Sequence, residues 1–165
     1  MPTPATSPTA ASLAPTVETC LWFDTEGEAA ARYYCSLFPD AAITEIFHQN
    51  GDPAAPAFTV EFTLMGQRYW ALNGGPHYKL TPACSISVHV ETQGEVDRLW
   101  TALLEGGGLE NRCGWLTDRW GLSWQIIPRA LPRLLKSDRA APVLQAMMAM
   151  IKLDIAALEA AAASG

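Results

Sequence analysis

The stretch LWFDTEGE, at residues 21–28, has a close counterpart in VHVETQGE, at residues 88–95. Each stretch begins with a short apolar run, passes through an acidic residue and ends in Thr-x-Gly-Glu. A Thr followed three positions later by Glu is typical of a capping box at a helix N-terminus, so each stretch predicts a strand that leads into a helix. Because this junction occurs twice, we expect two copies of one supersecondary unit that share a core and can form a cleft between them.

The residues around the two junctions predict the same order of elements. In the first half we expect a strand, a helix that Pro39 ends, and three more strands, at residues 19–23, 26–38, 42–48, 58–64 and 68–73. In the second half the corresponding strand, helix and two further strands fall at 85–90, 94–104, 113–116 and 122–127. Three glycines at 106–108 are suited to ending the second helix. Each half therefore reads as one strand, one helix and then two or three strands, which predicts an α+β fold.

The end of the chain departs from this repeat. A short helical stretch at 131–136 is followed by a pattern that predicts one longer helix from Ala140 to Ala161, with Ser137 or Asp138 as its cap. Its apolar stripe would pack either on its own domain or on a partner subunit. The stripe consists of Leu144, Met147, Ile151, Ile155 and Leu158.

Composition narrows the classes of function. The chain has 165 residues, 49% of them apolar, and a formal net charge of −6, which argues against nucleic acid as the main partner. It has no run of about 18 apolar residues, so we expect no membrane span. Four cysteines form no Cys-x-x-Cys pair, which favours free thiols and a cytoplasmic protein. We divide the chain into a disordered leader at 1–17, modules at 18–78 and 79–128, and a helical extension at 129–165.

Several sequence motifs resemble a known family. Paired βαβββ modules are the signature of the vicinal oxygen chelate superfamily, and the chain resembles its PhnB-like branch, whose members are often called 3-demethylubiquinone-9 3-methyltransferase-like. The motifs are LWFD at 21–24, YYCSLFPD at 33–40, ALNGGPH at 71–77, CGWLTDRWGLSWQIIP at 113–128 and KLDIAAL at 152–158. The resemblance implies paired βαβββ modules with an added C-terminal helix, in a homodimer. The methyltransferase name has no support in the residues, because no Gly-rich turn joins an opening strand to a helix.

The resemblance also identifies positions where metal enzymes of the superfamily bind one divalent ion. Their ligands are His and Glu side chains on the first and last strands of each module. The matching positions here are Glu18 or Thr19, Ala71 or Asn73, Ser85, and Gln125. Only Glu18 would bring a charge, and Ser85 is a far weaker ligand than an imidazole. The resemblance therefore implies no tightly held metal, while a weakly held divalent ion stays open.

A small molecule in the cup formed by the sheets is the predicted ligand. Trp22 and Trp115 would line an apolar cup, or would be ordinary core residues. Ser87 and His89 share one face of their strand by alternation. With the loop and last-strand positions added, the predicted ligand contacts are Trp22, Asn73, Ser87, His89, Trp115 and Gln125.

His89 is the candidate catalytic residue, because an imidazole suits proton transfer near neutral pH. The alternative is a hydrogen-bonded or solvated histidine at the end of a strand. Three hypotheses follow for the chain. It binds an apolar or aromatic small molecule without a tightly held metal, it is a lyase, isomerase or transferase that uses His89 as a base, or it is a structural dimer with a filled cup.

Overall fold

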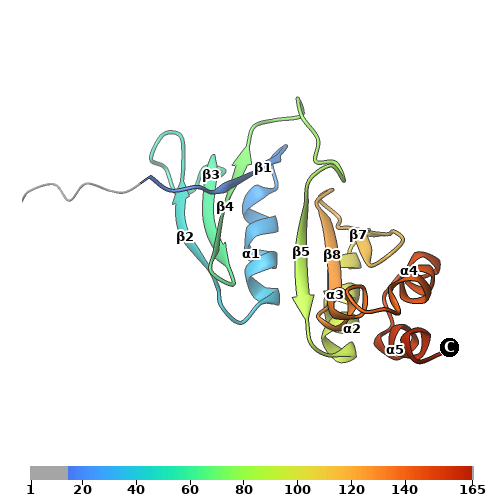
Figure 1. The fold of residues 1–165 in the computed structure, drawn as a ribbon. Coiled ribbons are helices and arrows are strands. Elements are labelled where there is room, and N and C mark those ends of the chain that lie inside the picture. Colours follow the sequence, from blue (N-terminus) through green and yellow to red (C-terminus); the bar gives the residue numbers. More distant parts are fainter. Residues whose placement is uncertain (1–14, 165) are drawn as a thin grey trace, which may run out of the picture.

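The computed structural model describes residues 15–164, so most of the predicted leader lies outside the described residues. The first half of the chain forms a four-stranded sheet, sheet A, with one helix packed on one face (Figure 1). Its strands lie in the order β1-β4-β3-β2, with β1 parallel to β4 and the other pairs antiparallel. The elements are β1 (Thr19–Phe23), α1 (Gly27–Leu37), β2 (Ala41–Phe47), β3 (Thr59–Leu64) and β4 (Gln67–Asn73).

The second half repeats this plan as sheet B, in the order β5-β8-β7-β6 with β5 parallel to β8. Each half is therefore a βαβββ module, as the repeated junction predicted. The strand predicted at 113–116 lies at 115–117, and a short strand that the sequence did not indicate precedes it. The elements are β5 (Ser85–Val90), α2 (Gln93–Leu104), β6 (Leu109–Glu110), β7 (Trp115–Thr117) and β8 (Ser123–Pro128).

Only one of the two predicted capping boxes forms. At α2 the Thr92 hydroxyl accepts from the Glu95 amide, and the Glu95 carboxylate accepts from the Thr92 amide. The box predicted at Thr25 and Glu28 was wrong: the N-cap of α1 is Glu26, with no side-chain hydrogen bond. The Glu28 carboxylate instead pairs with Arg32 at 2.8 Å, one helical turn further on.

Helix α1 lies between the two sheets. On one side it packs against Leu21, Val60 and Phe62 of sheet A, which are buried. On the other side the Tyr34 ring lies 5.1 Å from that of Trp124 in β8, centroid to centroid. The Tyr33 hydroxyl also donates to the Ala102 carbonyl oxygen in α2, at 2.7 Å. One continuous hydrophobic core therefore joins the modules through α1.

A buried carboxylate completes this contact. Asp118, in the turn between β7 and β8, accepts from the Tyr34 hydroxyl at 2.7 Å and from the Trp124 indole N–H at 2.9 Å. Its second oxygen accepts from the backbone amides of Trp120 and Leu122. Burial raises the pKa of the Asp118 carboxyl, although these four hydrogen bonds act to lower it. With all four donors paired, the carboxylate fixes the turn of one module to the helix of the other.

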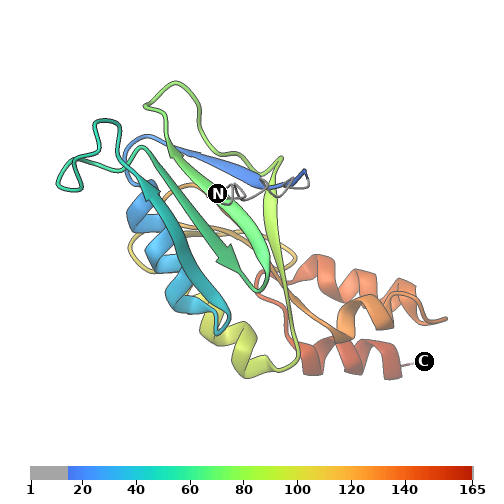
Figure 2. The ribbon, with the colours of Figure 1, turned by 90° about the vertical axis from the view of Figure 1, so that its left-hand side faces the viewer.

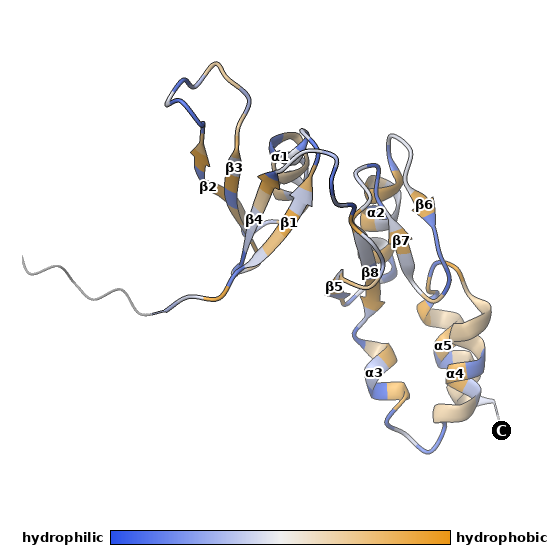
Figure 3. Cartoon of the chain, turned by 90° about the horizontal axis from the view of Figure 1, so that it is seen from above, coloured by the Kyte–Doolittle hydropathy of each residue, from blue (hydrophilic) through white to orange (hydrophobic). Residues whose placement is uncertain are grey.

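α1 and α2 cover the facing sides of the two sheets, and we call the opposite sides the open faces. On sheet B the Ile127 end of this face packs against α3, α4 and α5, so only the rest of it is free of helices. Side chains alternate along a strand, so Trp124 and Ile126 point to the helices and Gln125 points to the open face of sheet B. Viewed from above, α1 and α2 lie between the two sheets, whereas α3, α4 and α5 lie beyond sheet B (Figure 3). Figure 2 shows sheet A from its open face, with α1 behind it. The two open faces of one chain therefore point away from each other.

The long C-terminal helix predicted at 140–161 was wrong, because the structure has two helices there. After α3 (Ala130–Leu134), the helices α4 (Ala140–Ala149) and α5 (Ile155–Ala163) are separated by a non-helical segment, 150–154. The cap of α4 is Arg139, without a side-chain bond, rather than Ser137 or Asp138. Asp154 caps α5 through the Ala157 amide.

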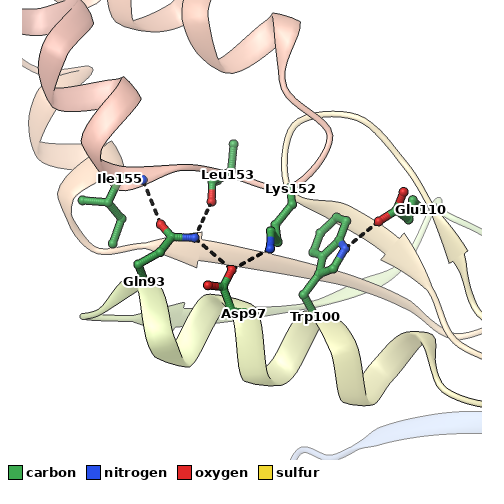
Figure 4. A network of polar contacts seen from close by, with 7 residues as sticks. All are labelled: Gln93, Asp97, Trp100, Glu110, Lys152, Leu153 and Ile155. Carbon is green, nitrogen blue, oxygen red and sulfur yellow. Dashed lines mark hydrogen bonds and ion pairs between the residues drawn. The ribbon is translucent and has the colours of Figure 1, made fainter.

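The break is fixed by contacts with the second module (Figure 4). The Gln93 amide of α2 donates to the Leu153 carbonyl and accepts from the Ile155 amide, at 3.2 and 2.9 Å. Lys152 pairs with Asp97 at 2.6 Å. The Leu153 side chain is fully buried. These contacts hold the segment in a non-helical conformation, and a continuous helix would not permit them.

The predicted apolar stripe is only partly buried. Leu158 is in the core, but Leu144 and Ile151 are exposed. The small second core contains Val143 and Leu153 instead. Within residues 15–164, no helix is long and apolar enough to cross a membrane.

Candidate functional site

Four of the predicted site residues share the open face of sheet B. Ser87 lies beside Gln125, and Gln125 beside Trp115, in the strand register, while His89 is two positions along from Ser87. The Ser87 hydroxyl lies 3.3 Å from His89 Nε2. The predicted catalytic residue and the predicted polar ligand contacts of the second module therefore occupy one surface.

His89 and Ser87 also border an apolar groove of about 310 Å³. The groove passes from the edge strand β5 to the turn between β3 and β4, so it lies between the modules. Polar atoms come mainly from its rim, where His89, Ser87, Gln67 and Arg129 lie. Its walls are apolar or aromatic, formed by Phe38, Leu64, Met65, Tyr69, Ile86, Val88 and Trp124. A concave apolar surface with a few polar groups at its edge is typical of a small-molecule site.

The first module's predicted contacts, Trp22 and Asn73, have local partners instead. The Trp22 indole N–H donates to the Gly75 carbonyl at 2.8 Å. Its ring covers Gly74 so closely that a Cβ there would lie 2.2 Å from the indole. The Asn73 amide accepts from the Gly27 amide and donates to the Ala57 carbonyl, both at 2.8 Å. The Asn-Gly-Gly sequence is thus accounted for by the contacts that join β1, β4 and α1.

The six predicted ligand contacts therefore do not form one cup within a chain. Trp22 and Asn73 belong to sheet A, whereas the other four residues lie on the open face of sheet B, which points away from it. Strand alternation indicated which side chains share a face. It contained no information on which faces meet, because that depends on the packing of α1.

The positions that match metal ligands of the superfamily do not suit a tightly bound ion. Glu18 is paired with Arg68 at 2.7 Å, so its charge is already neutralised. Ser85 accepts a hydrogen bond from the Gln125 amide at 2.9 Å, and both side chains offer a metal only a neutral oxygen. Among residues 15–164, no cluster of three His, Cys, Asp or Glu side chains has metal-binding geometry. Neutral donors of this kind bind divalent transition metals weakly.

Sequence reasoning missed Ser123, the residue beside Ser85 in the strand register. Its hydroxyl oxygen is buried and has no hydrogen-bond partner among the described residues. By alternation it belongs to the open face of sheet B, as Gln125 does. A buried polar atom without a partner is uncommon and calls for a water or a ligand group.

The paired modules and the open-faced sheets define a protein of the glyoxalase-like, vicinal oxygen chelate fold. The family model described as 3-demethylubiquinone-9 3-methyltransferase matches residues 15–127. The chain belongs to this family, within the PhnB-like branch of the superfamily. No curated protein matches the chain.

Two solved structures illustrate the similarity. A PhnB protein from Bacillus cereus is 28% identical over 69% of this chain and 99% of its own, with a TM-score of 0.61. A protein from Pseudomonas aeruginosa is 20% identical over 70% of this chain and 98% of its own, with a TM-score of 0.58. The second similarity concerns the fold alone. The C-terminal helices lie beyond the residues that the family model matches.

Proposed function

We propose that the chain binds a small apolar or aromatic molecule against sheet B, without a tightly held metal. The observation that supports this most directly is the apolar groove bordered by His89 and Ser87. Gln125 and the buried Ser123 hydroxyl add hydrogen-bonding groups on the adjoining open face. The apolar walls would supply most of the affinity, and the polar rim would orient the ligand.

A homodimer would complete the site under this proposal. Because the open faces of one chain point apart, a cup that uses both kinds of face needs sheet A of one copy against sheet B of another. Exposed aromatic side chains on the open face of sheet A, Trp70 and Phe47, suit such burial. The described cysteines are all unpaired, which supports a reducing compartment such as the cytoplasm.

The first experiment is a titration of the protein with 1-naphthol, a neutral aromatic probe, in which calorimetry measures the binding. Met65→Ser removes apolar surface from the rim of the groove, and we expect it to weaken binding by roughly threefold to tenfold. Met148→Ser is the matched control, because Met148 is similarly exposed but outside the groove. Equal affinity in the native chain and in Met65→Ser would contradict the proposal.

Metal analysis of the purified protein tests the other half of the proposal. The protein is incubated with Ni²⁺, Zn²⁺, Mn²⁺ and Mg²⁺, dialysed, and analysed for bound metal. We expect less than one ion per ten chains, because Glu18 is paired and Ser85 and Gln125 are neutral. Stoichiometric metal that Gln125→Ala removes would overturn the metal-free site.

The second candidate is an enzyme, a lyase, isomerase or transferase in which His89 acts as a base. The observation in its favour is that His89 and Gln125 lie on the same face of sheet B, as a shared substrate requires. The family's name refers to methyl transfer, but the loops that follow β1 and β5 are acidic rather than glycine-rich. For a ligand found by screening, the test is proton exchange with deuterated water. His89→Gln should abolish exchange with little loss of binding if His89 is the base.

A further inference from the structure

A second cleft lies where the end of β1 approaches the turn between β7 and β8, and we call it the junction cleft. Its volume is about 300 Å³, at the lower end of the range for ligand pockets. Its walls come from residues 22–26, from the connection 76–80 between the sheets, and from the turn 119–121. It shares no residue with the groove beside His89, so it is a separate place in the fold.

Aromatic rings form three parts of this wall, and other contacts hold two of them in place. Trp22 is fixed by its bond to the Gly75 carbonyl, and Tyr78 packs edge-on against it at 4.9 Å between ring centroids. Trp120 packs edge-on against the buried Tyr34 ring at 5.5 Å. Tyr78 is largely exposed, which is unusual for a large aromatic residue beside other rings. Rings positioned in this way suit a flat ligand.

The cationic groups of the cleft have no acidic partner. The Arg119 guanidinium lies 4.4 Å from the Tyr33 centroid and 4.1 Å from that of Trp120, so two rings hold it. Among residues 15–164, neither Arg119 nor Lys79 forms an ion pair. A guanidinium stacked in this way keeps its N–H edge free and loses little entropy when it binds a carboxylate.

Two acidic side chains also line the cleft. The Asp24 carboxylate has no ion-pair partner among the described residues, and that of Glu26 accepts only from the Thr25 amide, at 3.2 Å. A ligand with a carboxylate alone would bring its charge close to these two acids. A ligand with an ammonium alone would meet Arg119 and Lys79. Only a ligand with both a carboxylate and an ammonium group can pair with the two cations and the two acids of the cleft at the same time.

We propose that the junction cleft binds a small zwitterion with an aromatic ring, of the α-amino-acid type. Its carboxylate pairs with Arg119 and Lys79, and its ammonium group with Asp24 or Glu26. Its ring packs among Trp22, Tyr78 and Trp120. The site is independent of the proposed ligand of sheet B.

The test compares three probes of similar size on the full chain at pH 7. L-phenylalanine carries both charges, 2-phenylethylammonium carries only the ammonium, and 3-phenylpropanoate carries only the carboxylate. We expect phenylalanine to bind at least tenfold more tightly than either of the others, by calorimetry or saturation-transfer NMR. Equal binding of all three, or no binding of phenylalanine, would overturn the proposal.

Variants locate the site. Lys79→Gln and Asp24→Asn change exposed side chains without loss of stacking, and each should weaken phenylalanine binding threefold or more. Arg119→Gln should have a larger effect. Lys136→Gln, an exposed charge outside the cleft, and His89→Ala, at the other groove, should leave phenylalanine affinity unchanged. A loss of binding in His89→Ala that Lys79→Gln does not share would place the ligand at sheet B and refute the junction site.

Discussion

Replacing Tyr34 with Phe removes one hydroxyl from the contact between the modules and leaves the ring in place. The Tyr34 side chain is fully buried, and its hydroxyl donates to the Asp118 carboxylate at 2.7 Å. A hydrogen bond to a charged group contributes about 1.5–3 kcal/mol. For a domain of this size each kcal/mol corresponds to about 2–4 °C, so we expect Tm to fall by about 3–12 °C. The fold should be retained, because Asp118 keeps three donors.

The pH dependence of stability separates this bond from ordinary packing. Burial, followed by the charge of Asp118, raises the pKa of Tyr34 well above 10.0. In the unfolded chain Tyr34 ionises near its usual pKa, whereas in the folded chain it keeps its proton. Its stabilising contribution is therefore complete below about pH 10 and is lost as the pH rises above that value. One such group makes the free energy of unfolding fall by about 1.4 kcal/mol per pH unit.

The assay is denaturant unfolding between pH 8 and 11, with Tyr33→Phe as the control. Tyr33 donates to the Ala102 carbonyl at 2.7 Å and to the Glu105 carboxylate at 2.9 Å, but from a partly exposed position where solvent screens the charge, so its loss should cost about 0.5–1.5 kcal/mol. Above pH 10, stability should fall less steeply in Tyr34→Phe than in the native chain. An equally steep fall of the free energy of unfolding with pH in the native chain and in Tyr34→Phe would refute this role of the Tyr34 hydroxyl. A smaller loss of stability in Tyr34→Phe than in Tyr33→Phe would also refute it, because Asp118 would then not be the fixed acceptor of the Tyr34 hydroxyl.

Three further substitutions test local features. Gly74→Ala should destabilise the chain by about 1–3 kcal/mol in thermal unfolding, because its Cβ would lie 2.2 Å from the Trp22 indole. Gly94→Ala, with no atom closer than 4.0 Å to the new Cβ, should instead stabilise it by about 0.4–1 kcal/mol. Leu153→Ala should cost about 2–5 kcal/mol by denaturant unfolding, since this side chain is fully buried. Gln93→Ala should speed hydrogen exchange in α5, and unchanged protection there would contradict its role as a clamp.

Local sequence patterns predicted the elements well where neighbours along the chain decide the outcome. The two Thr-x-Gly-Glu motifs show where such patterns stop being sufficient. Arg32 lies one turn beyond Glu28 and binds its carboxylate, so the first box is replaced by an ion pair. At the same distance beyond Glu95 the residue is Leu99, which offers no charge, and the second box forms. A competing partner at i+4 thus distinguishes the two motifs.

The split C-terminal helix shows a different limit. Residues 140–161 carry an apolar pattern with no proline or glycine after Pro142, so local propensity favours one helix. In the structure, residues 150–154 lack the hydrogen bonds of a helix. Their backbone instead forms hydrogen bonds with the loop at Cys113 and Gly114. The Leu153 side chain is also buried. These contacts lie far away in sequence, and no pattern within the helix contains them.

The candidate site depends on long-range packing still more strongly. Alternation along β5 correctly grouped Ser87 and His89 on one face, and the structure adds Gln125 of β8 to it. Whether Trp22 joins them is decided by α1, whose Tyr34 reaches across to Trp124 and so sets the two helix-covered faces toward each other. That contact carries the Tyr34–Asp118 hydrogen bond and part of the core, so reversing the modules would remove one of the four donors to a buried carboxylate. The Tyr34 contacts that stabilise the monomer therefore turn its open faces outward, and under the proposed function a cup built from both faces would need two chains.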